Sequence, residues 1–558
     1  MAKWEILNID PWIKDYEDDI NLRMSEYEKA KNRLLGDGQT LSDFANAHHY
    51  YGFHKTKTGW IYREWAPNAD GLYLIGDFND WDRHAHPMKK INDEDWEISI
   101  KGIKTIPHGS RLKVLVDANG KISDRIPLFA KRVERDENGD FAAIMYNPRS
   151  KFKWNDSDFK IKNEDLLIYE AHIGMAGEEG KVSTYKEFEK NILPKIKKAR
   201  YNTVQLMAIA EHPYYGSFGY QVSNFYAPSS WYGEINDLKS LVNTAHKLGL
   251  NVIMDLVHSH AVKNTIEGIN EFDGTDYQFF HTGAKGEHPD WDSKLFDYAK
   301  PGVAHFLLSN VKYWLEEFHF DGFRFDGVTS MIYKNHGRGV SFDHYDKYFS
   351  MNTDIEAINY LQMANELARE VKEDVITIAE DMSAMPGMCL PISQGGIGFD
   401  YRLAMGMPDF WERTLEKRDE DWDLSNMWYE LSTHRPEEKR ISYVESHDQA
   451  LVGSKTTIFT LADQDMYWHM NNDDDNYIVE RAIALHKMIR WITISMGSDG
   501  YLNFMGNEFG HPEWIDFPRE GNGYSFDYAR RQWSLLENDN LKYQHLAKFD
   551  KKMLEFSK

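Results

Sequence analysis

Arg324 and Asp326 stand two residues apart in Gly-Phe-Arg-Phe-Asp-Gly, residues 322–327. In a β-strand, side chains at this spacing project from the same face. A guanidinium beside a carboxylate keeps the carboxylate ionised, as a nucleophile or a group that stabilises a developing cation requires. Taken alone, such a pair is more often a structural ion pair. This pair alone therefore does not indicate a catalytic site, and further residues are needed.

Three more apolar segments carry or end in polar side chains of the same kind. They are residues 375–382 with Glu380 and Asp381, residues 251–260 with Asp255, His258 and His260, and residues 440–449 with His447 and Asp448. Four hydrophobic strands that each finish in His, Asp, Glu or Arg are hard to explain as four independent solvated loops. We therefore expect one site, in which a second carboxylate, Glu380, joins the first.

The spacing of the apolar segments indicates which scaffold collects these strand ends. Strands are expected at 166–173, 203–209, 251–257, 322–328, 375–381, 399–405, 441–446 and 500–505. Most successive pairs enclose helical periodicity, at 187–200, 236–248, 304–318, 355–371 and 481–494. Eight strand-then-helix units predict an α/β fold, a (β/α)8 TIM barrel with its chemistry at the C-terminal strand ends. The polar strand ends obey that rule.

Residues 46–150 have a different pattern, with short alternating strands and turn signals such as Asn-Gly at 119–120. This pattern predicts an antiparallel β-sandwich. Trp65, Trp81 and Trp96 could line a glycan-binding surface or fill the sandwich core, and the sequence favours neither. The expected domains are a helical segment at 1–45, the sandwich at 46–150, the barrel at 151–530 and a helical segment at 531–558.

Composition favours a neutral substrate. The net charge of −24 argues against nucleic acid, because that binding needs Lys and Arg facing phosphates. Aromatic residues make up 14% of the chain, and their rings suit the flat faces of sugars. The single cysteine, Cys389, allows no internal disulfide, and no segment resembles a signal peptide or a membrane span. We expect a cytoplasmic protein with no membrane partner.

No metal and no other cofactor is expected. His258 and His260 are spaced like a pair of metal ligands, but no third ligand follows at a typical interval. Neither common form of glycine-rich phosphate loop is present, which argues against a nucleotide.

The strand-end segments resemble the signature regions of the α-amylase superfamily, and the sandwich resembles the carbohydrate-binding module of its starch- and glycogen-modifying branch. More narrowly, several long segments resemble 1,4-α-glucan branching enzymes. These are EHPYYGSFGYQVSNFYAPSS (211–230), HSHAVKNTIEGINEFDGT (258–275), GFRFDGVTSM (322–331), GGIGFDYRLAM (395–405), YVESHDQA (443–450) and GNEFGHPEW (506–514). The resemblance implies cleavage of an α-1,4-glucan such as glycogen, amylose or starch, and transfer of the cut chain to a 6-hydroxyl.

The resemblance also implies a role for each matching carboxylate. Asp326 matches the nucleophile that forms a covalent glycosyl-enzyme, Glu380 the general acid/base, and Asp448 a third carboxylate that holds sugar hydroxyls in the transition-state geometry. Retention of configuration requires the first two to lie roughly 5 Å apart. On neighbouring strands, the charge of Asp326 would help to raise the pKa of Glu380.

Five further residues match supporting positions of the family. Arg324 would keep the nucleophile ionised and oriented. His260 and His447 match histidines that hydrogen-bond the sugar just before the scissile bond. Tyr220 matches the tyrosine that stacks under the same ring, and Asp255 matches a structural aspartate.

Two alternatives stay open, a hydrolase of the amylase or debranching type and a non-catalytic glycogen-binding protein. If the enzyme is a transferase, water must be outcompeted, and the segments 213–220 and 270–297 are where we expect that control, together with aromatic platforms remote from the barrel mouth. Family members usually continue into a C-terminal β-sandwich, whereas this sequence ends at Lys558 after a helix-like stretch, 533–556. Three explanations stay open: the natural protein lacks that sandwich, the sequence is incomplete, or a separate polypeptide supplies the missing part. An uncovered flank of the barrel would expose apolar surface and favour self-association.

Overall fold

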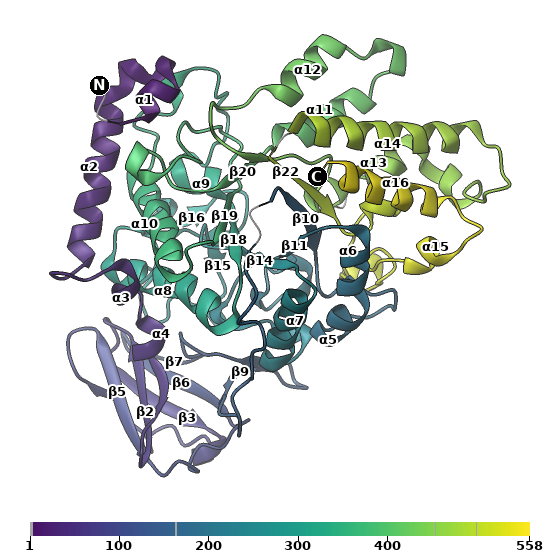
Figure 1. Ribbon diagram of the computed structural model, residues 1–558. Coiled ribbons are helices and arrows are strands. Elements are labelled where there is room, and N and C mark those ends of the chain that lie inside the picture. Colours follow the sequence, from purple (N-terminus) through teal and green to yellow (C-terminus); the bar gives the residue numbers. More distant parts are fainter. Residues whose placement is uncertain (1–3, 162–163, 452–453, 498, 558) are drawn as a thin grey trace.

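An eight-stranded parallel barrel forms the centre of the computed structural model, which describes residues 4–161, 164–451, 454–497 and 499–557 (Figure 1). Its strands are β10 (Leu166–Ala171), β11 (Thr203–Leu206), β14 (Asn251–Leu256), β18 (Gly322–Phe325), β19 (Ile376–Ala379), β20 (Tyr401–Leu403), β21 (Arg440–Ile441) and β22 (Gly500–Phe504). Neighbours follow the order β22, β10, β11, β14, β18, β19, β20, β21. The predicted barrel is confirmed.

The two strands at the ends of this order meet through Ser442, the residue after β21. Its N–H donates to the carbonyl of Gly500, and its carbonyl accepts from the N–H of Leu502, both at 2.9 Å. Inward-facing apolar side chains pack together as one cluster: Leu166, Ile168, Ile253, Ile376, Ile378, Leu403, Ile441, Tyr443 and Leu502. Because the strands are parallel, their C-terminal ends share one rim, where the active sites of such barrels lie.

Helices connect most successive strands and cover the barrel. The predicted helices correspond to α7 (Ile235–Lys247), α8 (Pro301–Phe318), α10 (Ile355–Val371) and α14 (Tyr477–Gly497), while α11 (Gly406–Leu415) and α12 (Leu424–Ser432) join β20 to β21. The predicted helix at 187–200 is divided into α5 (Tyr185–Glu187), a π-helical turn and α6 (Leu193–Ala199). After β22 come α15 (Trp533–Glu537) and α16 (Tyr543–Phe556), which packs against α14. No helix in the described residues is long and apolar enough to cross a membrane.

The crossover from β19 to β20 contains no α-helix within residues 380–400, all of which the structure describes. The prediction of eight strand-then-helix units is therefore wrong at this step. The loop contains Pro386 and Pro391, and its glycines at 387, 395 and 398 have positive φ. Proline and left-handed glycine both interrupt helices, which explains the extended path.

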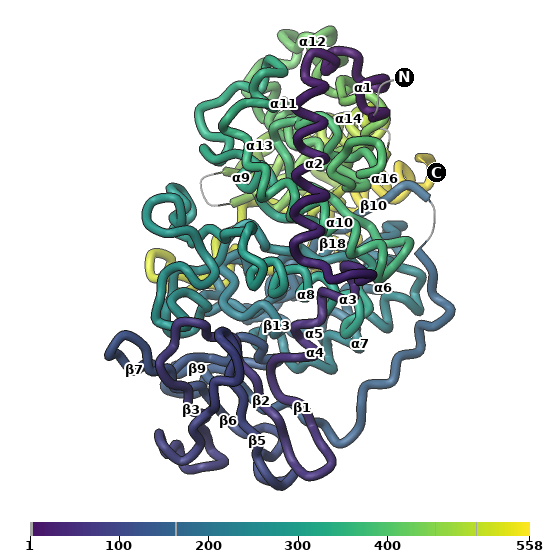
Figure 2. Tube along the Cα trace, turned by 90° about the vertical axis from the view of Figure 1, so that its left-hand side faces the viewer, coloured from purple at the N-terminus to yellow at the C-terminus, as the bar shows by residue number. Residues whose placement is uncertain are grey.

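The N-terminal helix α2 (Glu17–Leu34) covers this part of the barrel wall instead. Figure 2 shows α2 running alongside α10. Arg23 of α2 donates to the carbonyl of Pro386 at 3.4 Å, and Lys31 pairs with Glu366 of α10 at 3.1 Å. The N-terminal segment, for which no role was predicted, is thus part of the outer layer of the barrel.

The predicted antiparallel β-sandwich is confirmed as two facing sheets. One contains β1 (Gly52–Lys55), β2 (Gly59–Trp65), β5 (Asp95–Lys101) and β4 (Lys89–Lys90), and the other β3 (Gly71–Gly76), β6 (Arg111–Ala118), β7 (Lys121–Arg125), β9 (Phe141–Ile144) and β8 (Val133–Arg135). Trp65 and Trp96 are 6% and 5% exposed, so these two side chains fill the interior and do not line a surface. Only Trp81 is partly exposed.

Side chains of the sandwich hold the long loop between β14 and α8. The buried Arg125 donates to the carbonyls of Gly268 and Asn270, both at 2.7 Å. Asn68 donates to the carboxylate of Asp273 at 2.7 Å. Because that loop begins at the barrel rim, the sandwich helps to shape the mouth of the barrel.

Candidate active site

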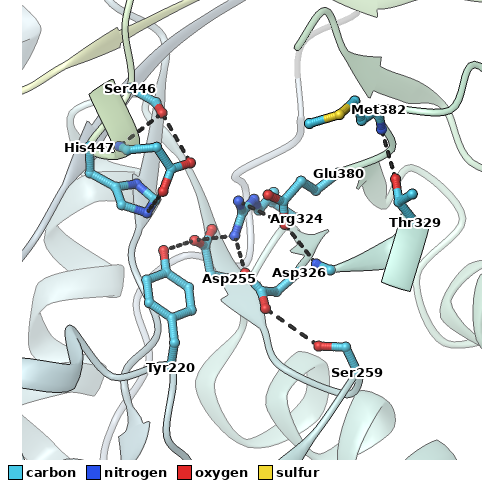
Figure 3. A network of polar contacts seen from close by, with 12 residues as sticks. Tyr220, Asp255, Ser259, Arg324, Asp326, Thr329, Glu380, Met382, Ser446 and His447 are labelled. Carbon is cyan, nitrogen blue, oxygen red and sulfur yellow. Dashed lines mark hydrogen bonds and ion pairs between the residues drawn. The ribbon is translucent and has the colours of Figure 1, made fainter. Parts of the chain in front are cut away.

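All eight residues predicted for the site lie at or near the C-terminal rim of the barrel, six of them labelled in Figure 3. Their positions are as follows: Asp255 in β14, His260 beyond its end, Arg324 in β18, Asp326 directly after it, Glu380 directly after β19, His447 and Asp448 after β21, and Tyr220 on the loop between β12 (Ala210–Glu211) and β13 (Asn224–Pro228). The structure therefore brings together residues that the sequence separates widely.

Arg324 is the centre of the site. Its guanidinium is buried and contacts three carboxylates: Nη1 donates to Asp326 at 2.8 Å and to Asp255 at 3.0 Å, and Nη2 pairs with Glu380 at 3.1 Å (Figure 3). The strands β18 and β19 that supply Arg324 and Glu380 are direct neighbours. The expectation that Asp326 and Glu380 meet across adjacent strands agrees with this shared guanidinium.

Glu380 has the properties of a proton donor. Burial, and to a smaller extent the charges of Asp326 and Asp448, raise the pKa of its carboxyl to about 8, while Arg324 and the N–H of Gly327 oppose the shift. The N–H of Gly327 donates to Glu380 Oε2 at 2.6 Å. A pKa of about 8 favours the protonated form of Glu380 at neutral pH, and burial contributes more to this shift than the neighbouring charges do.

Asp326 lies open to the cleft between these groups. Its side chain is 13% exposed and that of Glu380 16%, whereas Arg324 is only 3% exposed. Beyond Arg324, Ser259 Oγ lies 3.4 Å from Asp326 Oδ2. A substrate atom can thus reach both carboxylates, while the cation behind them is shielded from solvent.

His447 joins Asp448 to a carboxylate on the first barrel strand. Its Nδ1–H donates to Glu170 Oε1 at 2.7 Å, and Nε2 lies 3.2 Å from Asp448 Oδ1. Although burial opposes it, the charges of Asp448 and Glu170 raise the pKa of His447 well above its ordinary value. In return, His447 lowers the pKa of Asp448 against the effect of burial. Asp448 is therefore ionised over the whole neutral range.

Tyr220 and Asp255 form the floor of the site. The Tyr220 hydroxyl donates to Asp255 Oδ2 at 2.6 Å, and the tyrosine ring stacks on His447 with 5.4 Å between centroids. Burial raises the pKa of Asp255 to about 7, with Arg324 opposing. His260 Nε2–H donates to the Tyr220 carbonyl at 2.8 Å, and burial lowers the pKa of His260, so its ring is neutral.

The two histidines considered as metal ligands use their ring nitrogens elsewhere. His258 accepts from the hydroxyl of Tyr360 at 2.6 Å and donates to Asn310 at 2.9 Å. His260 contacts Ser259 and the Tyr220 carbonyl. Neither ring has a nitrogen directed at a common centre.

Three residues of this site were not singled out from the sequence. Glu170 lies near the end of the expected strand 166–173, so the rule that strand ends carry the chemistry could have found it. Ser259 and the backbone N–H of Gly327 gave no such signal, because their roles depend on the path of the chain after β14 and β18.

The arrangement has the chemistry of a retaining glycosidase-type site. A protonated acid, Glu380, and a second carboxyl group, Asp326, share one guanidinium at neighbouring strand ends. One can protonate a glycosidic oxygen while the other attacks the sugar.

Comparison with known families agrees with the fold. Residues 192–471 match the alpha amylase catalytic domain, and residues 50–130 match carbohydrate-binding module 48, the isoamylase N-terminal domain. Among solved structures, the chain is similar to the pullulanase from Bacillus acidopullulyticus (TM-score 0.65, 16% identity, 91% of this chain and 63% of that chain). It is also similar to a putative alpha amylase from Salmonella typhimurium (TM-score 0.66, 17% identity, 90% and 85%). The chain is therefore an α-amylase-type barrel protein with a carbohydrate-binding module.

Relatives with higher sequence identity show to which family within this class the chain belongs. The chain is 49% identical to a 1,4-alpha-glucan-branching enzyme of Rhizophagus irregularis, 50% to one of Yarrowia lipolytica and 48% to one of Equus caballus. Each match covers 98% of this chain, and 82%, 82% and 80% of the relative. The chain belongs to the 1,4-α-glucan-branching enzyme family, as its motifs predicted.

Proposed function

We propose that this chain branches α-glucans, with Asp326 as nucleophile and Glu380 as general acid/base. The observation that carries the proposal is their common contact with Arg324. The buried guanidinium holds both carboxyl groups between itself and the cleft. The raised pKa of Glu380 supports the assignment of the acid, because only the protonated form can donate to a leaving oxygen.

The reaction has two displacements. Asp326 attacks the anomeric carbon of an α-1,4 bond while Glu380 gives its proton to the departing 4-oxygen, which leaves a covalent glycosyl ester and an ionised Glu380. Glu380 then takes the proton of an incoming 6-hydroxyl, and the 6-oxygen displaces Asp326. The products are an α-1,6 branch, a free Asp326 carboxylate and a protonated Glu380, so the catalyst is regenerated.

The remaining site residues would bind the sugar or hold other side chains of the site in position. Asp448 and the protonated His447 would hold the hydroxyls of the sugar that carries the reacting carbon. Both ring nitrogens of His260 are engaged, by Ser259 and by the Tyr220 carbonyl, so His260 would position Tyr220 and not bind the sugar directly. Tyr220 would stack beneath the same ring. Asp255 has no role toward substrate in this scheme: it holds Arg324 and the Tyr220 hydroxyl.

Incubation with amylose distinguishes the proposal from its alternatives. A branching enzyme lowers iodine staining with little new reducing power, and debranching of the product then releases short chains. A hydrolase raises reducing ends in step with the loss of staining, and a glycan-binding protein changes neither. Asp326→Asn and Glu380→Gln keep the side-chain shape and should abolish turnover with nearly normal folding. Substantial activity of Glu380→Gln would refute the assignment of the acid.

We further propose a role in glycogen-type polymer synthesis in the cytoplasm. The buried free thiol of Cys389 suits a reducing compartment. Cell fractionation with an antibody to the chain tests the location. Self-association, expected from the sequence, would use exposed apolar side chains such as Trp491 and Phe556, whose rings lie 5.4 Å apart, and gel filtration measures it.

A further inference from the structure

Trp291 lies on a short hairpin of the long loop between β14 and α8. The hairpin consists of β16 (Glu287–His288) and β17 (Ser293–Lys294), and β17 also pairs with β15 (Ala261–Val262), which directly follows His260. Trp291 is 38% exposed. A single exposed tryptophan is normal on a protein surface. A function for Trp291 is therefore argued from its distance to the cleft and from the side chains that hold it.

The position of Trp291 is at the edge of the catalytic cleft. Its ring centroid lies 5.0 Å from that of His260, with the planes inclined by 55°. A Cβ atom added to Gly327 would come within 3.2 Å of the indole. The ring therefore lies beside the residue that follows Asp326 and that donates to Glu380.

One face of the indole is covered by a stacked histidine. The rings of Trp291 and His288 are 3.9 Å apart and inclined by only 5°. His288 Nδ1 accepts from the N–H of Trp291 at 3.2 Å, and Nε2–H donates to Ser330 at 3.0 Å. Burial lowers the pKa of His288 to about 3, so the supporting ring is neutral. His288 thus covers one face of the indole, while 38% of Trp291 remains exposed.

The ends of the hairpin turn are also fixed. Asp290 pairs with Arg338 at 2.9 Å, and Asp292 pairs with Lys263 at 2.8 Å. Gln221 donates to the carbonyl of Trp291 at 2.9 Å. An aromatic side chain that is already held in place loses little conformational freedom when a ligand stacks on it.

We propose that Trp291 is the platform on which a glucose unit of the acceptor chain stacks, so that its 6-hydroxyl reaches the intermediate before water does. The apolar C–H face of a pyranose ring matches an exposed indole face. The indole lies next to Gly327, whose backbone N–H orients Glu380. Glu380 gives its proton to the leaving 4-oxygen and later takes a proton from the attacking 6-hydroxyl. The inference rests on the proposed function and names the part of the substrate that this residue binds.

The test compares branching with hydrolysis in the same reaction. With amylose, reducing ends before debranching report hydrolysis, and the additional ends after debranching report branches. For Trp291→Ala we expect the ratio of branches to hydrolysis to fall roughly tenfold, because a contact made by the attacking chain is lost while attack by water is not. Trp291→Phe should keep most of the ratio. Trp428→Ala on α12, 65% exposed, is the matched control and should leave it unchanged.

An unchanged ratio of branches to hydrolysis would overturn the proposal, whether both activities stay the same or both fall by the same factor. If Trp291→Ala does not fold, Trp291→Leu replaces it, since leucine is apolar but has no flat ring, and a retained ratio would again overturn the proposal. Asp326→Asn serves as the reference for the reaction itself. It removes both activities if Asp326 is the nucleophile. The wild type tests the proposed function itself: additional ends after debranching are expected, and their absence would refute that function whatever Trp291 does.

Discussion

The N–H of Gly327 donates a 2.6 Å hydrogen bond to Glu380, so the residue after the proposed nucleophile also orients the proposed acid. Gly327 has φ +63°, and a Cβ atom there would meet Ser259 Oγ at 2.9 Å. One short segment after β18 thus sets the positions of Asp326, Glu380 and the Trp291 side of the cleft.

Gly327→Ala should impair both catalysis and stability. A side chain at positive φ costs about 1–3 kcal/mol, and the new methyl group displaces Ser259 or the backbone that holds Glu380. A small misplacement of reacting groups lowers the rate by roughly 10- to 100-fold. Gly523→Ala is the control, because Gly523 has φ +64° and open space around it. Equal branching rates for the two variants would contradict the role of Gly327.

The branching rate should fall at alkaline pH because Glu380 loses its proton. Burial raises the pKa of this carboxyl to about 8, so the fraction of enzyme with a protonated acid declines as the pH rises through that value. The measurement is kcat/KM against pH, which reports groups of the free enzyme. An alkaline limb that begins below pH 6 would disagree with this assignment.

The same pKa predicts a change in stability. A carboxyl whose pKa is raised on folding stabilises the folded state below its ordinary value of 4.5, and this contribution is lost as the pH rises to about 8. Glutamine does not titrate. The melting temperature of Glu380→Gln relative to the wild type should therefore increase between about pH 4 and pH 9. A constant difference across that range would count against a raised pKa.

Arg324→Met should destabilise the protein by about 3–5 kcal/mol at alkaline pH, where the buried Asp255, whose pKa is about 7 even beside Arg324, is left as a carboxylate without its cation. Urea unfolding gives the free energy. Adding Asp255→Asn to Arg324→Met removes that charge and should recover part of the loss, although the double variant stays inactive. If the second substitution added further destabilisation, the ion pair would not be the main contribution of Arg324.

Glu170→Gln should lower the pKa of His447, which is raised by Asp448 and Glu170. The histidine would then lose its proton at a lower pH, and the stability that its ion pairs provide would be lost from a lower pH upward. Histidine NMR of the labelled protein measures the pKa directly. An unaltered His447 resonance across the pH range in Glu170→Gln would contradict the coupling.

The sequence predicted the strands of the barrel and the residues at their ends because apolar β-branched runs that end in polar side chains are local signals. Arg324, Asp326 and Glu380 were found in this way. The conformation of the loops could not be predicted from such local signals. The covered face of Trp291, the φ angle of Gly327 and the interior position of Trp65 all depend on segments far apart in the chain.

The missing helix between β19 and β20 illustrates the same limit. The repeat of strands and helices favoured a helix there, whereas the prolines and glycines of residues 382–398 argued against it locally. That α2 would fill the gap could not be inferred from its own residues, because its partners are on α10 and the β19–β20 loop.

The position of α2 has a consequence for biosynthesis. Arg23 and its partner Pro386 are 363 residues apart. At a synthesis rate of 5–20 residues per second, α2 leaves the ribosome roughly 20–70 s before its docking surface exists. During that interval its apolar side chains, such as Met24 and Tyr27, remain uncovered. The helix α2 thus waits for partners that are made much later, and the nascent chain stays accessible to chaperones until residues 355–386 have been synthesised.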